Sequence, residues 1–232
     1  MRVQSLTLAA AGAALLVPAT LPAPASAGPR REPAARAEGR VRAADLLARV
    51  RHCTPVSRGR YRTDEGASAT VRVCGTHGAV FWKADMDIDC DGRYTARCNR
   101  RTDPMFSAAT AFQQSDGRHL NAERLPYIVV PAPSGVWDFR ANGVRGGAVV
   151  AVVYRNRVQY AVVGDTGPRG IIGEASYATA RGLGISPDPR RGGVPSGVTY
   201  IVFKGSRVRP IESHAAAVAT GQWLAGRFVR GG

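Results

Sequence analysis

Two carboxylates in the second half of the chain stand at the ends of short apolar segments. Asp165 follows the apolar residues 161–163 and a glycine, and Glu174 follows Ile171, Ile172 and a second glycine. Catalytic side chains are often placed in this way, because a strand holds the backbone while the turn after it leaves space for a substrate. Two carboxylates can also donate and accept protons within one reaction. We therefore take Asp165 and Glu174 as candidate catalytic residues.

Both carboxylates also have simpler interpretations. Asp165 could be a turn residue that accepts hydrogen bonds from nearby amides, and Glu174 could lie at a helix N-terminus, where the helix dipole favours an acidic group. The triplet Asp165-Thr166-Gly167 also matches the D-T-G of aspartic proteases, but those enzymes need two aspartates that share a proton. This chain contains one such triplet, so the protease interpretation would require a second copy of the chain.

A second acidic element runs through residues 80–92, where apolar and charged residues alternate. In a strand, successive side chains point to opposite faces. One face would then be apolar and would carry Val80, Trp82, Ala84, Met86 and Ile88. The other face would carry Lys83, Asp85, Asp87 and Asp89. The carboxylates of such a row repel one another, so they need a cationic partner, a metal ion or free access to water.

Three interpretations of this acidic row are open. It could line a groove for a cationic substrate, or it could be a solvated strand that pairs with arginines. It could also begin a calcium loop, because Asp87, Asp89, Asp91 and Gly92 follow the D-x-D-x-D-G pattern. The position where such a loop needs a bidentate Glu is Cys98, so the calcium match is incomplete. The cysteine and histidine spacings match no zinc site, and we expect neither a resident metal nor a cofactor.

The first 50 residues differ in composition from the rest. Residues 1–27 have the features of a secretory signal peptide, with Arg2 near the start, an apolar run and a small-residue cleavage site. Residues 28–50 are rich in Ala, Arg and Pro, which is typical of a linker, although 41–50 could form a short amphipathic helix. Residues 51–232 suit one domain with a single core. We expect a secreted, extracellular monomer.

The chain carries a net charge of +15 at pH 7. Such an excess can indicate a nucleic-acid partner, but the chain has no nucleic-acid motif and its aromatic residues are not interleaved with the basic ones. The segments after the signal peptide also lack the roughly 18 continuous apolar residues that a membrane span needs. We therefore expect no nucleic-acid partner and no membrane insertion, and we interpret the arginines as a solvated surface.

The apolar runs of residues 51–232 are short, β-branched and separated by Gly and Pro, which predicts strands. The predicted strands are 70–73, 80–88, 127–130, 147–153, 159–163 and 197–203, with a hairpin joining the fourth and fifth. Helices are predicted at 108–113, 175–182 and 213–228, the last with Ser213 as its N-cap. The expected fold class is thus mainly β (α+β), a compact β-barrel with small helical insertions.

Four cysteines in an exported chain are expected to form disulfides. They allow three pairings. We favour Cys53–Cys74 and Cys90–Cys98, because both pairs close short local loops.

Five ordered segments of the chain carry a family resemblance. They are K-A-D-M-D-I-D-C-D-G (83–92), L-P-Y-I-V-V-P (125–131), G-D-T-G-P (164–168), I-I-G-E-A-S (171–176) and S-G-V-T-Y-I-V-F (196–203). Together they resemble the chitosanases of glycoside hydrolase family 75, named for their fungal members. The turn between the two carboxylates is shorter here than in those members, and it also resembles a turn of double-psi β-barrel proteins.

The resemblance implies endo-hydrolysis, with inversion, of the β-1,4 linkages of chitosan, a glucosamine polymer, and it places the family's essential Asp and Glu on Asp165 and Glu174. Inversion needs an acid for the leaving oxygen and a base for the attacking water. We assign Glu174 as the acid, because its apolar neighbours could raise its pKa, and Asp165 as the base. Both should then face one groove, with carboxyl groups about 6.5–9.5 Å apart.

The substrate would be a polycation, and its ammonium groups would pair with carboxylates of the acidic row. Aromatic side chains would stack on the sugar faces. The implied substrate-binding residues are Lys83, Asp85, Asp87, Asp89, Trp82 and Tyr177. A second class of function stays open: the chain could be a non-catalytic polysaccharide- or cell-wall-binding module, or a peptidoglycan-active hydrolase that uses the same two carboxylates.

Overall fold

The computed structural model describes residues 38–231. The expected signal peptide, residues 1–27, and the beginning of the expected linker lie outside the described residues. No helix in the described part is long and apolar enough to cross a membrane.

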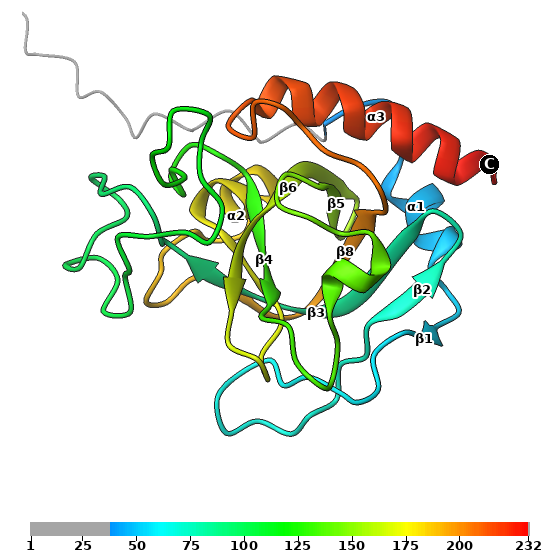
Figure 1. Ribbon diagram of the computed structural model, residues 1–232, viewed down its shortest axis with the longest axis horizontal. Coiled ribbons are helices and arrows are strands. Elements are labelled where there is room, and N and C mark those ends of the chain that lie inside the picture. Colours follow the sequence, from blue (N-terminus) through cyan, green and yellow to red (C-terminus); the bar gives the residue numbers. More distant parts are fainter. Residues whose placement is uncertain (1–37, 232) are drawn as a thin grey trace, which may run out of the picture. The chain divides into compact units, whose positions relative to one another are not determined.

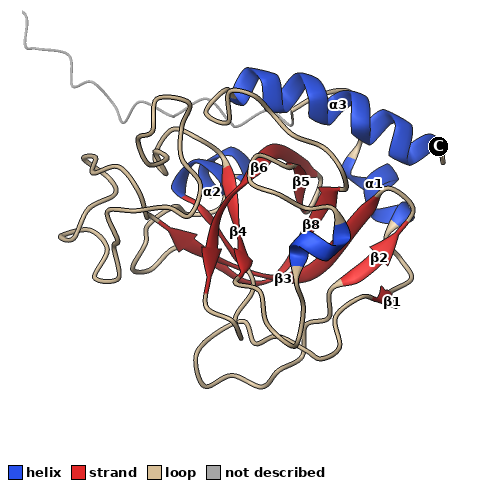
Figure 2. Ribbon diagram, viewed as in Figure 1, coloured by secondary structure: helices blue, strands red, loops and turns tan. Residues whose placement is uncertain are grey.

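Strands outnumber helices in this part of the chain (Figures 1 and 2). The elements are, in order, α1 (Ala43–Arg49), β1 (Thr54–Pro55), β2 (Cys74–Thr76), β3 (Ala79–Asp89), β4 (Tyr127–Pro131), the 3₁₀ helix η1 (Phe139–Asn142), β5 (Val149–Tyr154), β6 (Arg157–Gly167), β7 (Glu174–Ser176), α2 (Tyr177–Leu183), β8 (Val194–Phe203) and α3 (His214–Arg230).

Six of these strands close into a barrel. The strand order is β3-β7-β4-β6-β5-β8, and β8 pairs back onto β3 to complete the ring. The contacts β3–β7 and β4–β6 are parallel, and the others in the ring are antiparallel. The predicted fold class, a mainly β compact barrel with small helices, is confirmed, and a double-psi form of this barrel stays a prediction that the turn between the two carboxylates suggested.

Alternation along the strands divides the apolar side chains into two sets. One set fills the barrel and includes Trp82, Ile128, Val152, Val163 and Tyr200. The other set points outward and packs under the helices, which lie against the outside of the barrel in Figure 1. Period-two alternation therefore builds two cores from the same strands.

Most predicted elements are confirmed. Five of the six predicted strands form, and Arg155 and Asn156 turn the predicted hairpin between β5 and β6. Ser213 caps α3, because its side chain accepts a hydrogen bond from the amide of Ala216. Residues 70–73 contribute only an isolated bridge, between Tyr61 and Val71. The helix predicted at 108–113 is wrong, because the segment is an irregular loop there.

Both favoured disulfides, Cys53–Cys74 and Cys90–Cys98, are present. The first ties the segment before β1 to β2, and the second ties the end of β3 to the loop that follows it.

The folded domain begins before residue 51. α1 lies within the segment that composition identified as a linker, and Ala43, Leu46 and Val50 are buried in the outer core. α1 is the short amphipathic helix that the sequence allowed at 41–50, and its few apolar residues form one buried stripe. The linker expected over 28–50 stays a prediction for the residues before this helix.

Candidate active site

Asp165 lies near the end of β6, where the strand pairing is irregular. Ile128 of β4 is opposite Val163, but the next residue, Val129, is opposite Asp165, so Gly164 is an extra residue in β6. A Cβ at Gly164 would come within 2.6 Å of the Tyr127 side chain, so only glycine fits there. Bulges of this kind redirect the side chain that follows them. The G-D sequence therefore sets where the Asp165 carboxylate points.

Glu174 opens β7 directly after a glycine in an unusual conformation. Gly173 has a φ of +126°, and a Cβ at this position would lie 1.9 Å from a carboxylate oxygen of Asp85. Glycine is therefore required on both conformational and steric grounds. Glu174 then pairs in parallel with Asp87 of β3. The I-G-E motif thus makes a sharp turn that places the Glu174 carboxylate beside β3.

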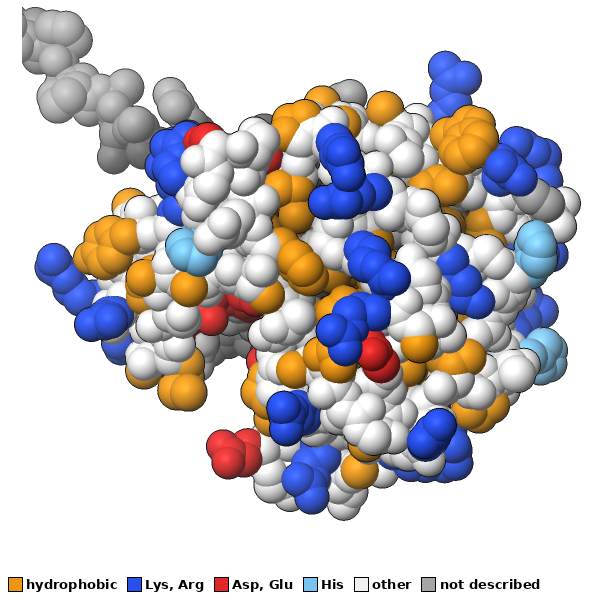
Figure 3. All heavy atoms as spheres, in the orientation of Figure 1, with side chains coloured by type: hydrophobic (Ala, Val, Ile, Leu, Met, Phe, Trp, Pro, Cys, Tyr) orange, Lys and Arg blue, Asp and Glu red, His pale blue; other side chains and the backbone are white. Residues whose placement is uncertain are grey.

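Asp165 and Glu174 line the same cleft, whose volume is about 340 Å³. Five further carboxylates line it, those of Asp87, Asp89, Asp91, Asp103 and Asp188. Arg190 is the one lysine or arginine among the lining residues that the structure describes. In Figure 3, acidic side chains lie in a hollow beside the loops that follow β3, while basic side chains are spread over the surrounding face. The cleft is an acidic site in a basic protein.

The two candidate catalytic carboxylates have different surroundings. Burial, together with the charges of Asp87, Asp91 and Asp165, raises the pKa of Glu174 to about 7. The Asp165 carboxylate accepts hydrogen bonds from the amides of Ala111 and Thr166, both at 2.7 Å. Burial raises the pKa of Asp165, and these two hydrogen bonds oppose the rise. The arrangement can therefore supply a protonated acid at Glu174 and an ionised base at Asp165.

The acidic row of β3 is divided between two places. Asp87 and Asp89 line the cleft, and burial raises the pKa of Asp89 well above its usual value. Asp85 does not line it. Its side chain is 3% exposed, and burial, followed by the charge of Asp87, raises its pKa to about 7. Asp85 instead lies against Gly173, with a carboxylate oxygen in the space that a Cβ there would fill.

The expectation that Trp82 stacks on a sugar is wrong. Trp82 is 1% exposed and lies inside the barrel, where it stacks on Tyr200 at 5.3 Å. Lys83 is exposed on β3 but is not among the residues that line the cleft. Tyr177 is half-buried and lines an adjoining depression that shares Asp188 with the cleft. Of the residues chosen for sugar stacking, only Tyr177 is therefore near the site.

Asp103 and Asp188 were missed in the sequence. Both come from irregular loops outside the predicted strands, and both precede a proline. An Asp-Pro pair indicates a turn, and Asp188 does accept hydrogen bonds from the amides of Arg190 and Arg191. The sequence therefore carries a signal for two turns, but no signal that they meet at one cleft.

Comparison with known proteins places these residues in a family. Residues 86–224 match the family described as fungal chitosanase of glycosyl hydrolase group 75. This segment is more than half of the chain and contains both candidate catalytic carboxylates. The chain belongs to this family.

Individual relatives are fungal proteins. Endo-chitosanase C of Aspergillus oryzae is 32% identical over 138 residues, which is 57% of this chain and 33% of that protein. An endo-chitosanase of Aspergillus oryzae (strain ATCC 42149 / RIB 40) is 32% identical over 143 residues, or 56% of this chain and 58% of the relative. An endo-chitosanase of Aspergillus fumigatus is 28% identical over 188 residues, 75% of this chain and 76% of its own. The match thus spans only part of the first two relatives.

Among solved structures, the Streptomyces papain inhibitor (SPI) aligns with 53% of this chain and 94% of its own, at 18% identity and a TM-score of 0.31. So low a score supports no conclusion about fold or function.

Proposed function

We propose that this protein is a secreted, endo-acting glycoside hydrolase that cleaves the β-1,4 linkages of chitosan with inversion. The observation that carries the proposal is that Asp165 and Glu174 line one acidic cleft. The family match and the names of the relatives, endo-chitosanases, supply the substrate class. Two carboxylates are sufficient for hydrolysis of a glycosidic bond, so the reaction needs no cofactor.

Glu174 is the proposed general acid and Asp165 the proposed general base. Within residues 38–231, the Glu174 carboxylate accepts no hydrogen bond, whereas that of Asp165 accepts two from backbone amides. Amide donors favour the ionised carboxylate that a base requires, and burial without such donors favours the protonated form that an acid requires. Glu174 would protonate the leaving oxygen while Asp165 activates a water on the opposite face of the sugar.

The strand arrangement supports the wider carboxylate separation of an inverting enzyme. β6 and β7 lie on either side of β4, which separates their backbones by about 9–10 Å. Oε2 of Glu174 lies 2.6 Å from where a Cβ of Gly167 would be. Gly167 is two residues beyond Asp165 on the same strand face, about 6.5–7 Å along β6. This spacing favours a gap that admits a water molecule over the shorter distance of a retaining enzyme.

The charge of the cleft fits a polycationic substrate. The protein as a whole is strongly basic, so it would repel chitosan at long range. The carboxylates of Asp89 and Asp103 along the cleft would form charge-assisted hydrogen bonds with the ammonium groups of successive sugars. Met105, which is 86% exposed at the cleft, offers an apolar contact for a sugar ring.

Export is part of the proposal. Two disulfides are typical of an oxidising compartment, and a polymer outside the cell is accessible only to an exported enzyme. We expect the mature chain to act as a monomer, since the proposed acid and base come from one chain.

The test is release of reducing ends from chitosan, with chitin and peptidoglycan as comparison substrates. Asp165→Asn and Glu174→Gln keep the shape of each side chain and remove its proton transfer, so each should lower the rate on chitosan by about 10²–10⁴-fold. Asp45→Asn, on α1 and outside the cleft, is the matched control and should keep full activity. Hydrolysis of peptidoglycan alone, or binding without any hydrolysis, would overturn the proposal.

The roles of the two carboxylates can be separated. An aryl glycoside with a leaving group that needs no protonation should restore much of the activity of Glu174→Gln and none of that of Asp165→Asn. The anomer that forms first, followed by NMR, reports the stereochemistry. A β-anomer as the first product would contradict inversion, and the reverse pattern of recovery would exchange the assigned roles.

A further inference from the structure

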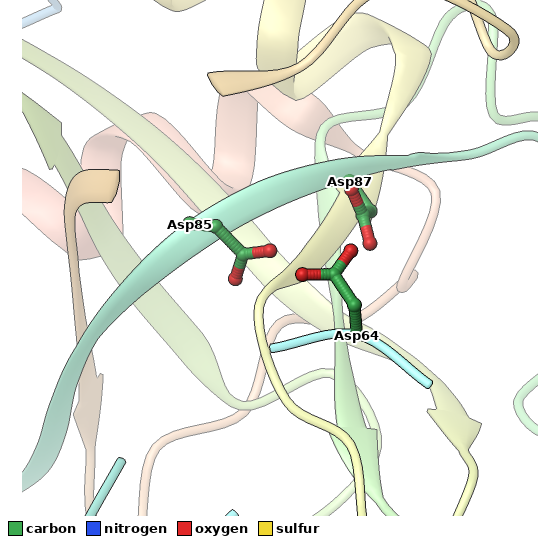
Figure 4. Close-up of side chains that lie close together, drawn as sticks. All are labelled: Asp64, Asp85 and Asp87. Carbon is green, nitrogen blue, oxygen red and sulfur yellow. The ribbon is translucent and has the colours of Figure 1, made fainter. Parts of the chain in front are cut away.

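Three carboxylates meet outside the proposed catalytic pair. Asp85 and Asp87 lie on β3, and Asp64 lies on the loop between β1 and β2 (Figure 4). Each offers one oxygen atom, and these three atoms all lie within 4.8 Å of one another. We call Asp64, Asp85 and Asp87 the acidic triad.

Asp85 is the residue that distinguishes this triad from an ordinary acidic surface. Its side chain is 3% exposed, and its Oδ1 atom is buried without a hydrogen-bond partner. In Figure 4 its carboxylate points toward Asp64 and Asp87. A buried, unpartnered carboxylate oxygen is costly, so a ligand that approaches from the triad would satisfy it.

No basic side chain neutralises the triad. The ion pairs among residues 38–231 involve other carboxylates, those of Glu38, Asp45, Asp116 and Asp138. The negative charge of three neighbouring carboxylates must be balanced by a bound cation or by protons. An ammonium group on a sugar ring could meet the exposed Asp64 and Asp87, but the sugar would prevent it from reaching the buried oxygen of Asp85. A free metal ion has no such limit.

The ligand type and number favour Ca²⁺. Hard cations bind carboxylate oxygens, and three carboxylates offer up to six of the six to eight that Ca²⁺ takes. Mg²⁺ usually binds through only one or two carboxylates and keeps several of its waters. A site made of three carboxylates is therefore more typical of Ca²⁺.

A cation at the triad would hold together two segments beside the proposed active site. The amide of Arg62 donates to the carbonyl of Gly170, and the amide of Ile172 donates to the carbonyl of Arg62. The Asp64 loop therefore already runs along the residues that lead to Glu174. Asp85 packs against Gly173 from the other side. A bound ion would join this loop to β3 with the Glu174 segment between them.

We propose that Asp64, Asp85 and Asp87 form a calcium site that fastens the loop around Asp64 to the barrel. This site differs from the D-x-D-x-D-G loop considered in the sequence, because Asp89 and Asp91 are not part of it. Its existence does not depend on chitosan hydrolysis, since it stabilises the folded chain whatever the cleft does.

The experiment measures the melting temperature of the full chain after dialysis against EGTA, with and without about 10 mM CaCl₂. A site of this kind should bind with a Kd of about 10⁻⁴–10⁻³ M, and Ca²⁺ should then raise the Tm by about 3–10 °C. Asp64→Asn should abolish the rise, and so should Asp87→Asn. Both residues are exposed, so neither substitution removes a packed side chain.

Glu65→Gln is the matched control. Glu65 is exposed on the same turn but is not in the triad, so this variant loses one negative charge and should keep the full calcium response. Isothermal titration of CaCl₂ should give one site in wild type and in Glu65→Gln. No rise in wild type, or an equal rise in Asp64→Asn, would overturn the site. An equal response to MgCl₂ would overturn the choice of Ca²⁺.

Discussion

Gly167 controls the position of the Glu174 carboxylate. A side chain at Gly167 would place its Cβ 2.6 Å from Oε2 of Glu174 and 3.0 Å from a methyl group of Val129. The glutamate is the more mobile of these two neighbours, so it would move first. Its carboxylate would then leave the position from which it can reach the leaving oxygen.

We therefore expect Gly167→Ala to lower kcat on chitosan at least tenfold while the Tm changes by no more than about 2–3 °C. Gly170→Ala is the matched control in the same turn, because a Cβ at Gly170 meets nothing within 4 Å. Steady-state kinetics and thermal melts of both variants check the prediction. Wild-type kcat in Gly167→Ala would show that the carboxylate does not act from this position.

At the scale of elements, α3 covers the outer face of the barrel and approaches β6 closely at one glycine. A Cβ at Gly221 would lie 2.3 Å from the ring of Tyr160 on β6. Gly226, one and a half turns later, has only the end of the Arg230 side chain near it, at 3.4 Å. The same substitution in one helix can therefore have opposite effects at these two positions.

Gly221→Ala should destabilise the protein by about 1–3 kcal/mol, because the added methyl overpacks the contact with Tyr160. Gly226→Ala should stabilise it by up to about 1 kcal/mol, since alanine is the better helix former where space allows. Chemical denaturation of the two variants measures both free energies of unfolding. A loss of stability in both would contradict the packing explanation.

At the scale of the whole molecule, the protein concentrates carboxylates in one cleft of a basic surface. Asp91 illustrates the consequence. Burial, together with the charges of Asp165 and Asp103, raises its pKa to about 6. The hydrogen bond that its carboxylate accepts from the Ser107 amide lowers the pKa, but by less than the other effects raise it. A carboxyl group whose pKa is raised by folding binds its proton more tightly in the folded state. Its contribution to stability is present below about pH 4 and is lost as the pH rises through about 6.

Asp91→Asn removes this titration. The Tm of the variant relative to wild type should therefore increase by several degrees between pH 4 and pH 7. The melts are run in EGTA, so that bound metal does not contribute. Asp45→Asn is the control, because Asp45 is paired with Arg42 on the surface and its pKa is lowered; its difference from wild type should stay small. A constant difference for Asp91→Asn across this range would disprove the prediction.

Local patterns in the sequence were sufficient to predict most of the helices and strands and to select the two candidate catalytic residues. Alternation of apolar residues predicted the barrel strands, Ser213 predicted the start of α3, and short loops predicted both disulfides. These features depend on neighbours in sequence. Asp165 and Glu174 were chosen as candidates for the same reason, since each lies at the end of an apolar segment beside glycines that the local geometry requires.

Closure of the barrel decided what the sequence alone left open. The alternation of side chains along a strand assigns residues to two faces, but it does not determine which face a closed barrel encloses. Closure of this barrel placed Trp82 inside, beside Tyr200. Alternation placed Asp85 and Asp87 on one face of β3, but only Asp87 lines the cleft. Asp64 joins them from a separate loop, and Asp103 and Asp188 reach the cleft from two loops that are distant in sequence. Contacts between distant segments form only when the chain folds, because the local patterns of a sequence do not specify which distant segments will meet.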